Sequence, residues 1–359
     1  MSRDLRGKVV LLTGCRIKIG YAMAVSLLRC GATLIGTTRF VHDGYARFMQ
    51  EPDYNEWGGR VHLFALDLRD MWMVTQFCHY VTKQFPKLFA IINNAAQTIA
   101  RTPEYTAALR QQELQPPLHV TDEVQKRPLN EQEWHRFFMS NSSVSIGIPL
   151  QITHHPEEHA SPFQSAGEST CSTIAALPQQ RGGIVYDRYD TQFEESDKRE
   201  KNSWTMELHE VRGSEAAEVM AINALSPFIM NSRLKPLLLH REHDAPNEGR
   251  FIINVSAMEG QFYRFKQTTH PHTNMAKAAL NMMTRTSAED YARDQIFMNS
   301  VDTGWITDES PALKKQRRQE DFMLCPLDEV DAAARCLDLI YSDSKEFGKF
   351  WKDFHTIPW

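Results

Sequence analysis

The sequence predicts a doubly wound α/β protein, in which helices cover both faces of a parallel β-sheet. Short apolar runs at 9–12, 32–38, 61–66 and 88–92 have the length of buried strands. A helix-like stretch separates each run from the next, and this alternation is typical of right-handed βαβ units. With 359 residues and 42% hydrophobic content, the chain can bury a core of this kind. Ligands of such sheets lie at the carboxyl ends of the strands.

The first strand leads into a glycine turn, KVVLLTGCRIKIG at 8–20. Gly14 would let the backbone turn sharply, and Gly20 would let the following helix approach the strand closely. The helix N-terminus, with Ile19 in its first turn, would offer amide donors to a pyrophosphate. Two glycines after a strand also occur in plain βα turns, so this motif alone leaves a structural interpretation open. Arg16 and Lys18 suit an additional phosphate, or else lie solvated on the turn.

The second strand, at 32–38, indicates which dinucleotide would bind. In dinucleotide-binding folds an acid at the end of this strand binds the ribose 2′-hydroxyl of NAD, whereas an arginine accommodates the 2′-phosphate of NADP. Arg39 follows the strand directly, and no Asp or Glu occurs from 33 to 40. The sequence therefore predicts NADP(H) as the cofactor.

Polar residues follow the third and fourth strands. Asp67 and Leu68 come after the third strand, and the fourth ends in Asn93-Asn94-Ala95-Ala96. The run TGCRIKIG resembles the TGxxxGxG turn of the short-chain dehydrogenase/reductases. Asp67 resembles the acid of that family that contacts adenine, and the NNAA run is similar to its NNAG.

The resemblance continues downstream and covers roughly residues 6–96 and 204–359. Asn223 in MAINALSPF resembles the helix Asn of the catalytic tetrad, FIINVSAMEG resembles the strand that carries the catalytic Ser, and TNMAKAAL resembles the YxxxK helix start. VDTGWITDE, with Thr303 and Gly304, is similar to the PG turn that folds over the nicotinamide. The resemblance implies a Rossmann-type sheet of about seven strands, with GKFWKDF as the last. It also implies the cofactor-binding set Gly14, Arg16, Lys18, Ile19, Gly20, Arg39, Asp67, Leu68, Asn94, Ala95, Ala96, Lys277, Thr303 and Gly304.

The catalytic positions depart from the family pattern. Lys277 and Asn223 match, but Thr273 stands where the family has its Tyr, and Ala257 where it has its Ser. In the family the Tyr hydroxyl exchanges a proton with the substrate oxygen. A Thr hydroxyl is a far weaker acid than a phenol, whose pKa is about 10, so the ordinary proton relay is altered.

Nearby residues could replace the missing groups. The candidates are Ser256, Tyr263, His270 and His272, and histidine is the side chain best matched to proton transfer at neutral pH. Plain structural roles stand beside these: Tyr263 as a packed aromatic and His272 as a histidine bonded to a backbone carbonyl.

Residues 97–203 form an insertion between the two parts of the dinucleotide-binding domain, which we place at 1–96 and 204–359. More than a hundred residues separate Asn94 from Asn223, whereas family members use a few tens. The insertion contains two helix-like pieces, 104–113 and 129–140. Because it leaves the sheet at the end of the fourth strand, we expect a lid or a partly disordered lobe at the active-site rim. A tolerated surface insertion is the alternative.

Composition narrows the function classes. A net charge of −5 gives no general attraction to nucleic acid, and no apolar run is long enough to span a membrane. The six cysteines are scattered without metal-ligand spacing, and the histidines do not form a known metal motif. We therefore expect a cytoplasmic protein without metal that acts on a small molecule.

Two functions fit these residues. One is an atypical NADP(H)-dependent oxidoreductase that acts on a carbonyl, hydroxyl or imine of a small organic substrate. The other is a pseudoenzyme that binds NADP as a sensing or structural ligand and presents its insertion to a partner. The resemblance also implies a homodimer or homotetramer, because relatives commonly pair through the two helices that begin near Asn223 and Lys277.

Overall fold

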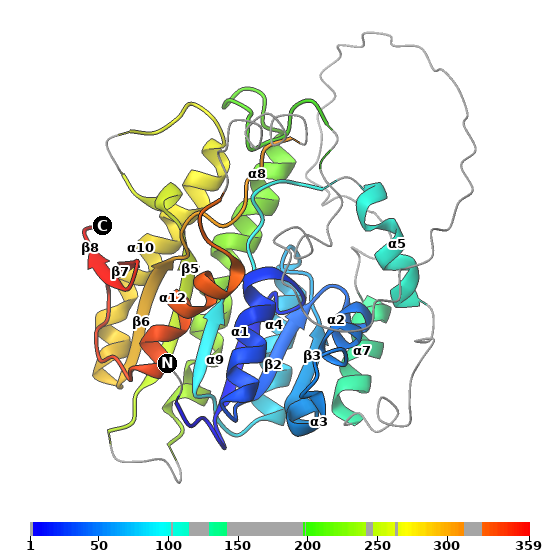
Figure 1. Ribbon diagram of the computed structural model, residues 1–359, viewed down its shortest axis with the longest axis vertical. Coiled ribbons are helices and arrows are strands. Elements are labelled where there is room, and N and C mark those ends of the chain that lie inside the picture. Colours follow the sequence, from blue (N-terminus) through cyan, green and yellow to red (C-terminus); the bar gives the residue numbers. More distant parts are fainter. Residues whose placement is uncertain are drawn as a thin grey trace.

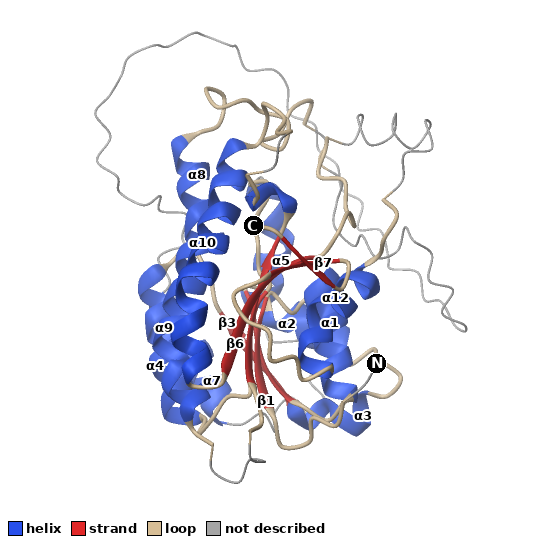
Figure 2. Ribbon diagram, turned by 90° about the vertical axis from the view of Figure 1, so that its left-hand side faces the viewer, coloured by secondary structure: helices blue, strands red, loops and turns tan. Residues whose placement is uncertain are grey.

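The computed structural model describes residues 3–101, 103–114, 129–141, 197, 199–241, 247–262, 265–311 and 325–359. One eight-stranded sheet, in the order β3-β2-β1-β4-β5-β6-β7-β8, forms its centre. Figure 2 shows the sheet between two helical layers. The strands are β1 Val9–Thr13, β2 Thr33–Thr38, β3 Val61–Ala65, β4 Ala90–Asn93, β5 Arg250–Ser256, β6 Ile296–Asp302, β7 Phe350–Lys352 and β8 His355–Ile357.

Helices connect the strands and cover both faces, as the alternating pattern predicted. On one face lie α4, α8, α9 and α10, and on the other α1, α2, α3 and α12 (Figures 1 and 2). Their bounds are α1 Lys18–Arg29, α2 Val41–Phe48, α3 Tyr54–Trp57, α4 Met71–Gln84, α8 Gly213–Met220, α9 Ser226–Leu239, α10 Pro271–Arg293 and α12 Glu329–Tyr341. None of the helices in the described ranges is long and apolar enough to cross a membrane.

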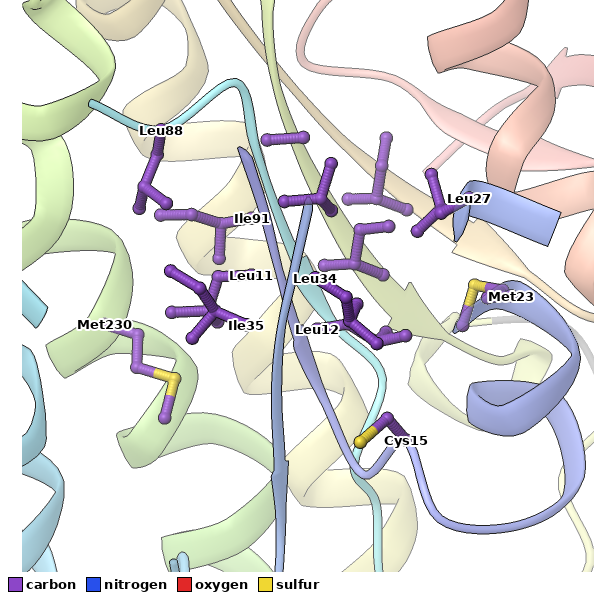
Figure 3. Close-up of a cluster of buried hydrophobic side chains, with 14 of the residues drawn as sticks. Leu11, Leu12, Cys15, Met23, Leu27, Leu34, Ile35, Leu88, Ile91 and Met230 are labelled. Atoms are coloured by element: carbon purple, nitrogen blue, oxygen red, sulfur yellow. The ribbon is translucent and has the colours of Figure 1, made fainter. Parts of the chain in front are cut away.

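The central strands are apolar on both sides because both of their faces are covered. Leu11 of β1 points toward Met230 of α9, while its neighbour Leu12 points toward Met23 of α1 (Figure 3). All of these side chains are buried. This explains why β1 reads as a continuous apolar run rather than as an alternating one.

The sheet ends, beside β7, in a short strand that the sequence did not reveal. The predicted sheet of about seven parallel strands is confirmed, with β7 in the GKFWKDF segment, but β8 then returns antiparallel to β7. The turn between them is made by Asp353 and Phe354, both at positive φ (47° and 65°). Three-residue strands are too short to show a periodic pattern, and a turn without glycine gives no hairpin signal.

Two helices of the insertion pack on the same domain. Helix α5 (Pro103–Leu114) and helix α7 (Leu129–Asn141) confirm the helical pieces expected at 104–113 and 129–140. Trp134 of α7 is 2% exposed, and its indole N–H donates to the carbonyl oxygen of Ala65 on β3 at 2.8 Å. Helix α7 therefore covers the edge strand β3, which would otherwise be open to pairing.

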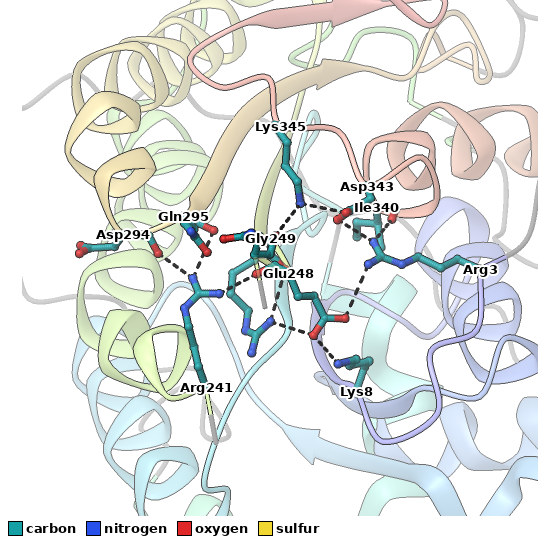
Figure 4. A network of polar contacts seen from close by, with 12 residues as sticks. Arg3, Lys8, Arg241, Glu248, Gly249, Asp294, Gln295, Ile340, Asp343 and Lys345 are labelled. Atoms are coloured by element: carbon teal, nitrogen blue, oxygen red, sulfur yellow. Dashed lines mark hydrogen bonds and ion pairs between the residues drawn. The ribbon is translucent and has the colours of Figure 1, made fainter. Parts of the chain in front are cut away.

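Ionic contacts stabilise the amino edge of the sheet, where the parallel strands begin (Figure 4). The carboxylate of Glu248 accepts a hydrogen bond from Lys8 at 2.5 Å and lies 3.5 Å from the buried guanidinium of Arg250. Arg3 approaches the same carboxylate at 3.6 Å. These contacts join the start of the chain to the start of β5, at the end of the sheet away from the site described next.

Candidate cofactor and active site

The glycine turn after β1 has the close contacts that the sequence predicted. Gly14 has φ +69°, and a Cβ on Gly20 would lie 2.0 Å from the carbonyl oxygen of Gly14. Only glycine fits at either position. Ile17, the residue before α1, makes no side-chain hydrogen bond to the first turn of the helix, and helix N-termini bind anions. Lys18 begins that helix at φ 54° and Ile19 packs against the core beside it.

The end of β4 holds the glycine turn in place. The Asn94 side-chain amide donates to the carbonyl oxygens of Thr13 and Gly14, at 3.0 and 3.2 Å. The Thr13 hydroxyl accepts hydrogen bonds from the backbone N–H of Asn94 and of Ala95, both at 3.0 Å. The role of Thr13 was missed in the sequence, because it depends on a contact between strands. Ala96 follows on the exposed side of the same segment.

Cations gather at the carboxyl end of β2. The Arg39 guanidinium lies over the Phe40 ring, 5.4 Å from its centroid, and Arg16 lies at the same distance from that ring. Arg16 also pairs with Asp43 at 2.6 Å, whereas Arg39 makes no ion pair within the described ranges. The Arg39 side chain is exposed to solvent, although protein atoms around it partly desolvate its guanidinium. Desolvation and the nearby charges of Arg69, Arg16 and Arg110 lower its pKa, against the attraction of Asp67.

Asp67 is already engaged by a residue that the sequence did not single out. Arg69 donates to both of its carboxylate oxygens, Nε to Oδ1 at 2.9 Å and Nη2 to Oδ2 at 2.6 Å. Burial alone would raise the pKa of Asp67, but the hydrogen bonds and charge of Arg69 lower it. The structure thus places a guanidinium beside the acid that we expected to contact adenine. Leu68 is buried, and its carbonyl oxygen accepts from Ser226 at 2.8 Å.

A carboxylate from the insertion binds the N-terminus of α2. Glu113 of α5 accepts hydrogen bonds from the backbone N–H groups of Val41 (3.0 Å), His42 (2.9 Å) and Asp43 (3.3 Å). These amides follow Arg39 and Phe40 directly in the chain. No sequence pattern predicts this contact, because 70 residues separate Asp43 from Glu113.

Asn223 and Thr273 are brought together by one short segment after β4. Asn223 lies in a π-helical turn, Ala221–Leu225, and its side chain bonds both backbone groups of Gln97: N–H to Oδ1 at 2.8 Å and Nδ2 to O at 2.9 Å. The hydroxyl of Thr273 donates to the carbonyl oxygen of Thr98, the residue after Gln97, at 3.4 Å. π-turns of this kind occur often at functional sites.

Lys277 lies one turn beyond Thr273, with its ammonium buried at the end of β5. Nζ donates to the carbonyl oxygen of Val255 at 2.8 Å. Burial lowers the pKa of Lys277 to about 8, although Glu259, Asp302 and Cys336 act in the opposite direction. A Lys with a pKa near working pH can exchange protons.

Ser256 is engaged by a hydrogen bond to α10. Its buried hydroxyl donates to Oδ1 of Asn281 on α10 at 2.6 Å. Ala257, which follows it where the family has its Ser, has no hydroxyl. The turn after it lies against α10, because a Cβ on Gly260 would be 2.6 Å from the Lys277 backbone. Ser256 therefore supports the strand end.

The two histidines before Thr273 differ in their surroundings. His270 stacks on Trp204, with centroids 4.0 Å apart, and its Nδ1 lies 2.9 Å from the Trp204 carbonyl oxygen, which is a structural role. His272 is 2% exposed, and neither ring nitrogen has a hydrogen-bond partner within the described ranges. Burial lowers the pKa of His272, while Glu215 and the Thr98 backbone oppose this shift. Tyr263 lies outside the described residues.

The bend after β6 completes the carboxyl edge. Gly304 has φ +84° and donates its N–H to Oδ1 of Asp302 at 3.2 Å, with Thr303 buried between them. Oδ2 of Asp302 pairs with Lys352 at 2.7 Å. No group of three metal-ligating side chains occurs in the ranges that the structure describes.

Comparisons with known proteins agree with this arrangement. A family model for "short chain dehydrogenase" matches residues 8–121, and one for "Enoyl-(Acyl carrier protein) reductase" matches residues 200–327. Uncharacterized protein R665 of Acanthamoeba polyphaga mimivirus is 28% identical over 98% of this chain and 67% of its own length. The 2-dehydro-3-deoxy-D-gluconate 5-dehydrogenase of Pseudoalteromonas atlantica is 32% identical over 28% of this chain and 38% of its own length.

Among solved structures, a blue fluorescent protein from a metagenomic library, crystallised with NADPH, superposes with a TM-score of 0.57. It is 18% identical, and the match covers 97% of this chain and 96% of that one, which shows a shared fold. The two family models describe successive parts of one fold, and the structure joins both parts in a single sheet. The two family models and the shared fold together support a protein of the short-chain dehydrogenase/reductase family.

Proposed function

We propose that the protein is an atypical NADP(H)-dependent oxidoreductase that acts on a carbonyl, hydroxyl or imine of a small organic substrate. The observation that carries this proposal is the position of Asn223 and Thr273 at the segment after β4. Lys277 lies at the end of β5, and all three residues share the sheet edge of the glycine turn and Arg39. Cofactor-binding and catalytic positions thus lie where ligands of parallel sheets bind.

The residues present fit a dinucleotide phosphate. The space beside Gly14 and Gly20 has no room for a side chain, and the uncapped N-terminus of α1 follows it. These amides would bind the pyrophosphate. Arg39 would bind the 2′-phosphate through charge-assisted hydrogen bonds, which are about twice as strong as neutral ones. Lys277 would contact the nicotinamide ribose, as the family resemblance implies.

The nicotinamide supplies the hydride chemistry, and the protein must manage one proton. Thr273 is poorly suited, because its hydroxyl is a weak acid and already donates to the Thr98 carbonyl. Lys277 and His272 are better matched. The pKa of Lys277 is lowered to about 8 by burial, and His272 keeps both ring nitrogens without partners in the described part of the chain.

We also propose that residues 97–203 shape the active-site rim as a lid. Gln97 and Thr98, at the start of the insertion, contact Asn223 and Thr273. Asn202, near its end, donates to the carbonyl oxygen of Glu309 at 2.9 Å, in the segment after β6. Both ends of the insertion thus lie at the carboxyl edge, where lids exclude water from a reaction.

A second function is favoured by one observation. The two hydroxyls that the family uses for catalysis are missing or engaged, since Ala257 has none and Thr273 donates its own to a backbone carbonyl. A pseudoenzyme that binds NADP as a sensing or structural ligand would need only the cofactor-binding positions.

Turnover assays separate the two functions. The purified protein is mixed with NADPH and a panel of aldehydes, ketones and cyclic imines, and the decrease of NADPH fluorescence is followed. The enzyme proposal expects oxidation of NADPH with at least one member of the panel, abolished in His272→Ala or in Lys277→Met. Tight binding of NADPH without oxidation across the panel, and without effect of either substitution, would leave the pseudoenzyme as the function.

A further inference from the structure

The N-terminus of α2 is an anion-binding site that the protein fills with its own carboxylate. Glu113 accepts from three successive backbone N–H groups, those of Val41, His42 and Asp43, and its carboxylate lies 3.8 Å from Nδ1 of His42. Helix α5, which carries Glu113, packs against α2 (Figure 1). Helix N-termini bind anions because their first amides lack internal acceptors and the helix dipole is positive there.

This anion site adjoins the cations at the end of β2. Arg39 is the last residue before Phe40, which precedes the first turn of α2, and Arg16 pairs with Asp43 inside that turn. An arginine at this place accommodates the 2′-phosphate of NADP in dinucleotide-binding folds. Arg39 and the three amides therefore follow one another at the end of β2 and the start of α2, and Glu113 accepts from the amides.

We infer that Glu113 occupies the position of the cofactor 2′-phosphate and is a residue that determines cofactor selectivity. This inference rests on the function proposed above. NADP(H) must displace the Glu113 carboxylate, and with it the end of α5, before its 2′-phosphate reaches the α2 amides. NAD(H) has no 2′-phosphate, so it leaves the contact in place.

The charges explain why the contact can be exchanged. Burial raises the pKa of Glu113, although the α2 amides and His42 oppose this shift, so the carboxylate is held partly desolvated. A phosphate monoester carries about −1.5 to −2 charges at pH 7 and offers three acceptor oxygens, against one charge for Glu113. Arg39 adds attraction for it. Two anions cannot share these donors, so binding of NADP(H) is weakened by the cost of releasing Glu113.

Titration calorimetry tests the inference on the full chain, with NADP+ and NAD+ as ligands. Glu113→Gln and Glu113→Ala remove the competing charge and should lower the dissociation constant for NADP+ about tenfold, the factor that corresponds to 1.4 kcal/mol. The dissociation constant for NAD+ should stay unchanged or rise. Glu133→Gln is the matched control: it removes the same charge from an exposed position of α7 and should leave both constants at the wild-type values.

A second measurement needs no variant. Hydrogen exchange of the α5 amides in the wild-type protein should become faster on addition of NADP+ and stay unchanged on addition of NAD+. If both Glu113 variants bind NADP+ as the wild type does, or if NADP+ slows exchange in α5, the inference is wrong while the cofactor site stands. If neither the wild type nor any variant binds either dinucleotide, the proposed function fails and the inference fails with it.

Discussion

Lys277 is the residue whose environment is hardest to explain by stability alone. Its ammonium is buried, with the Val255 carbonyl oxygen as its hydrogen-bond acceptor, and burial lowers its pKa from 10.5 to about 8. Each pKa unit corresponds to about 1.4 kcal/mol, so keeping the charge at neutral pH costs about 3 kcal/mol. A residue kept at such a cost is typical of a functional site.

Lys277→Met should therefore stabilise the protein. Because the folded-state pKa is depressed, the unfolded state binds more protons than the folded state between pH 8 and 10.5, and wild-type stability rises through that window. The gain of the variant should be largest below pH 8 and should disappear by about pH 10.5. Thermal unfolding measured from pH 6 to 10.5 tests this.

Lys235 provides the control for this prediction. Its hydrogen bonds to Asp290 and Asp294 raise its pKa, against the effect of desolvation. Lys235→Met should therefore not stabilise at neutral pH. Lower stability of Lys277→Met at pH 7, relative to the wild type, would contradict the cost assigned to the buried ammonium.

The proton-transfer residue can be identified by removing one candidate side chain and, separately, by restoring the two side chains that the family has. If His272 transfers the proton, His272→Ala should lower kcat by about 10²- to 10⁴-fold, the usual contribution of a general acid or base. If the chemistry has been lost, Thr273→Tyr combined with Ala257→Ser should create or raise turnover. Steady-state kinetics with NADPH decides between them. An unchanged kcat in His272→Ala would remove His272 from the mechanism, and no gain of turnover in the double variant would contradict the loss of chemistry at Thr273 and Ala257.

At the residue scale, contacts within a motif were predictable and contacts between distant segments were not. Gly14 and Gly20 follow from the need of a βα turn for close approach, which a five-residue spacing reveals. The Glu113 contact with α2 joins residues about 70 positions apart and depends on tertiary packing. The Arg69 contact with Asp67 is local, but it depends on side-chain orientation, which no motif in the sequence states. The adenine contact expected of Asp67 stays a prediction.

Two neighbouring helices on one face of the sheet expose several large apolar side chains. They lie on α10 and at the start of α9: Leu225 is 48% exposed, Phe228 56%, Met275 57% and Met282 56%. Exposed apolar side chains gathered on neighbouring elements are typical of association surfaces. They lie on the helices through which relatives were expected to pair.

We predict that the protein self-associates through α9 and α10. Light scattering at micromolar concentration should give a multiple of 41.3 kDa for the wild type and 41.3 kDa for Phe228→Asp, because a charge at the centre of an apolar contact is desolvated without a partner. Leu208→Asp, at an exposed position of the segment before α8, should keep the wild-type mass. A wild-type mass of 41.3 kDa would refute the prediction.

At the element scale, the buried strands and their helices were predictable because each is long enough to show its period. The apolar runs at 32–38 and 61–66 contain β2 and β3. The π-turn at Ala221–Leu225 was not predictable, since it arises from a local change of hydrogen bonding inside an otherwise helical sequence. The packing of α7 on β3 was not predictable either, because the apolar residues of a helix do not indicate which element they pack against.

In the whole molecule, a cluster of polar residues lies at each of two edges of the sheet, where the parallel strands begin and where they end. At the amino edge Glu248 is satisfied by Lys8, Arg3 and Arg250, so the charges there join the chain ends. At the carboxyl edge Lys277 is held with a depressed pKa, His272 lacks partners within the described ranges, and Arg39 has no ion pair there. This contrast is the reason to place the function at the carboxyl edge.

The central claim is that the end of β2 binds the 2′-phosphate of NADP(H), and calorimetric titration of NADP+ and NAD+ into the wild type and Arg39→Ala tests it most directly. We predict tighter binding of NADP+ than of NAD+ to the wild type. In Arg39→Ala the affinity for NADP+ should fall by about 1.5–3 kcal/mol, the value of a charged hydrogen bond, and the affinity for NAD+ should hold. Equal affinities in the wild type, or an undiminished preference in Arg39→Ala, would contradict the claim.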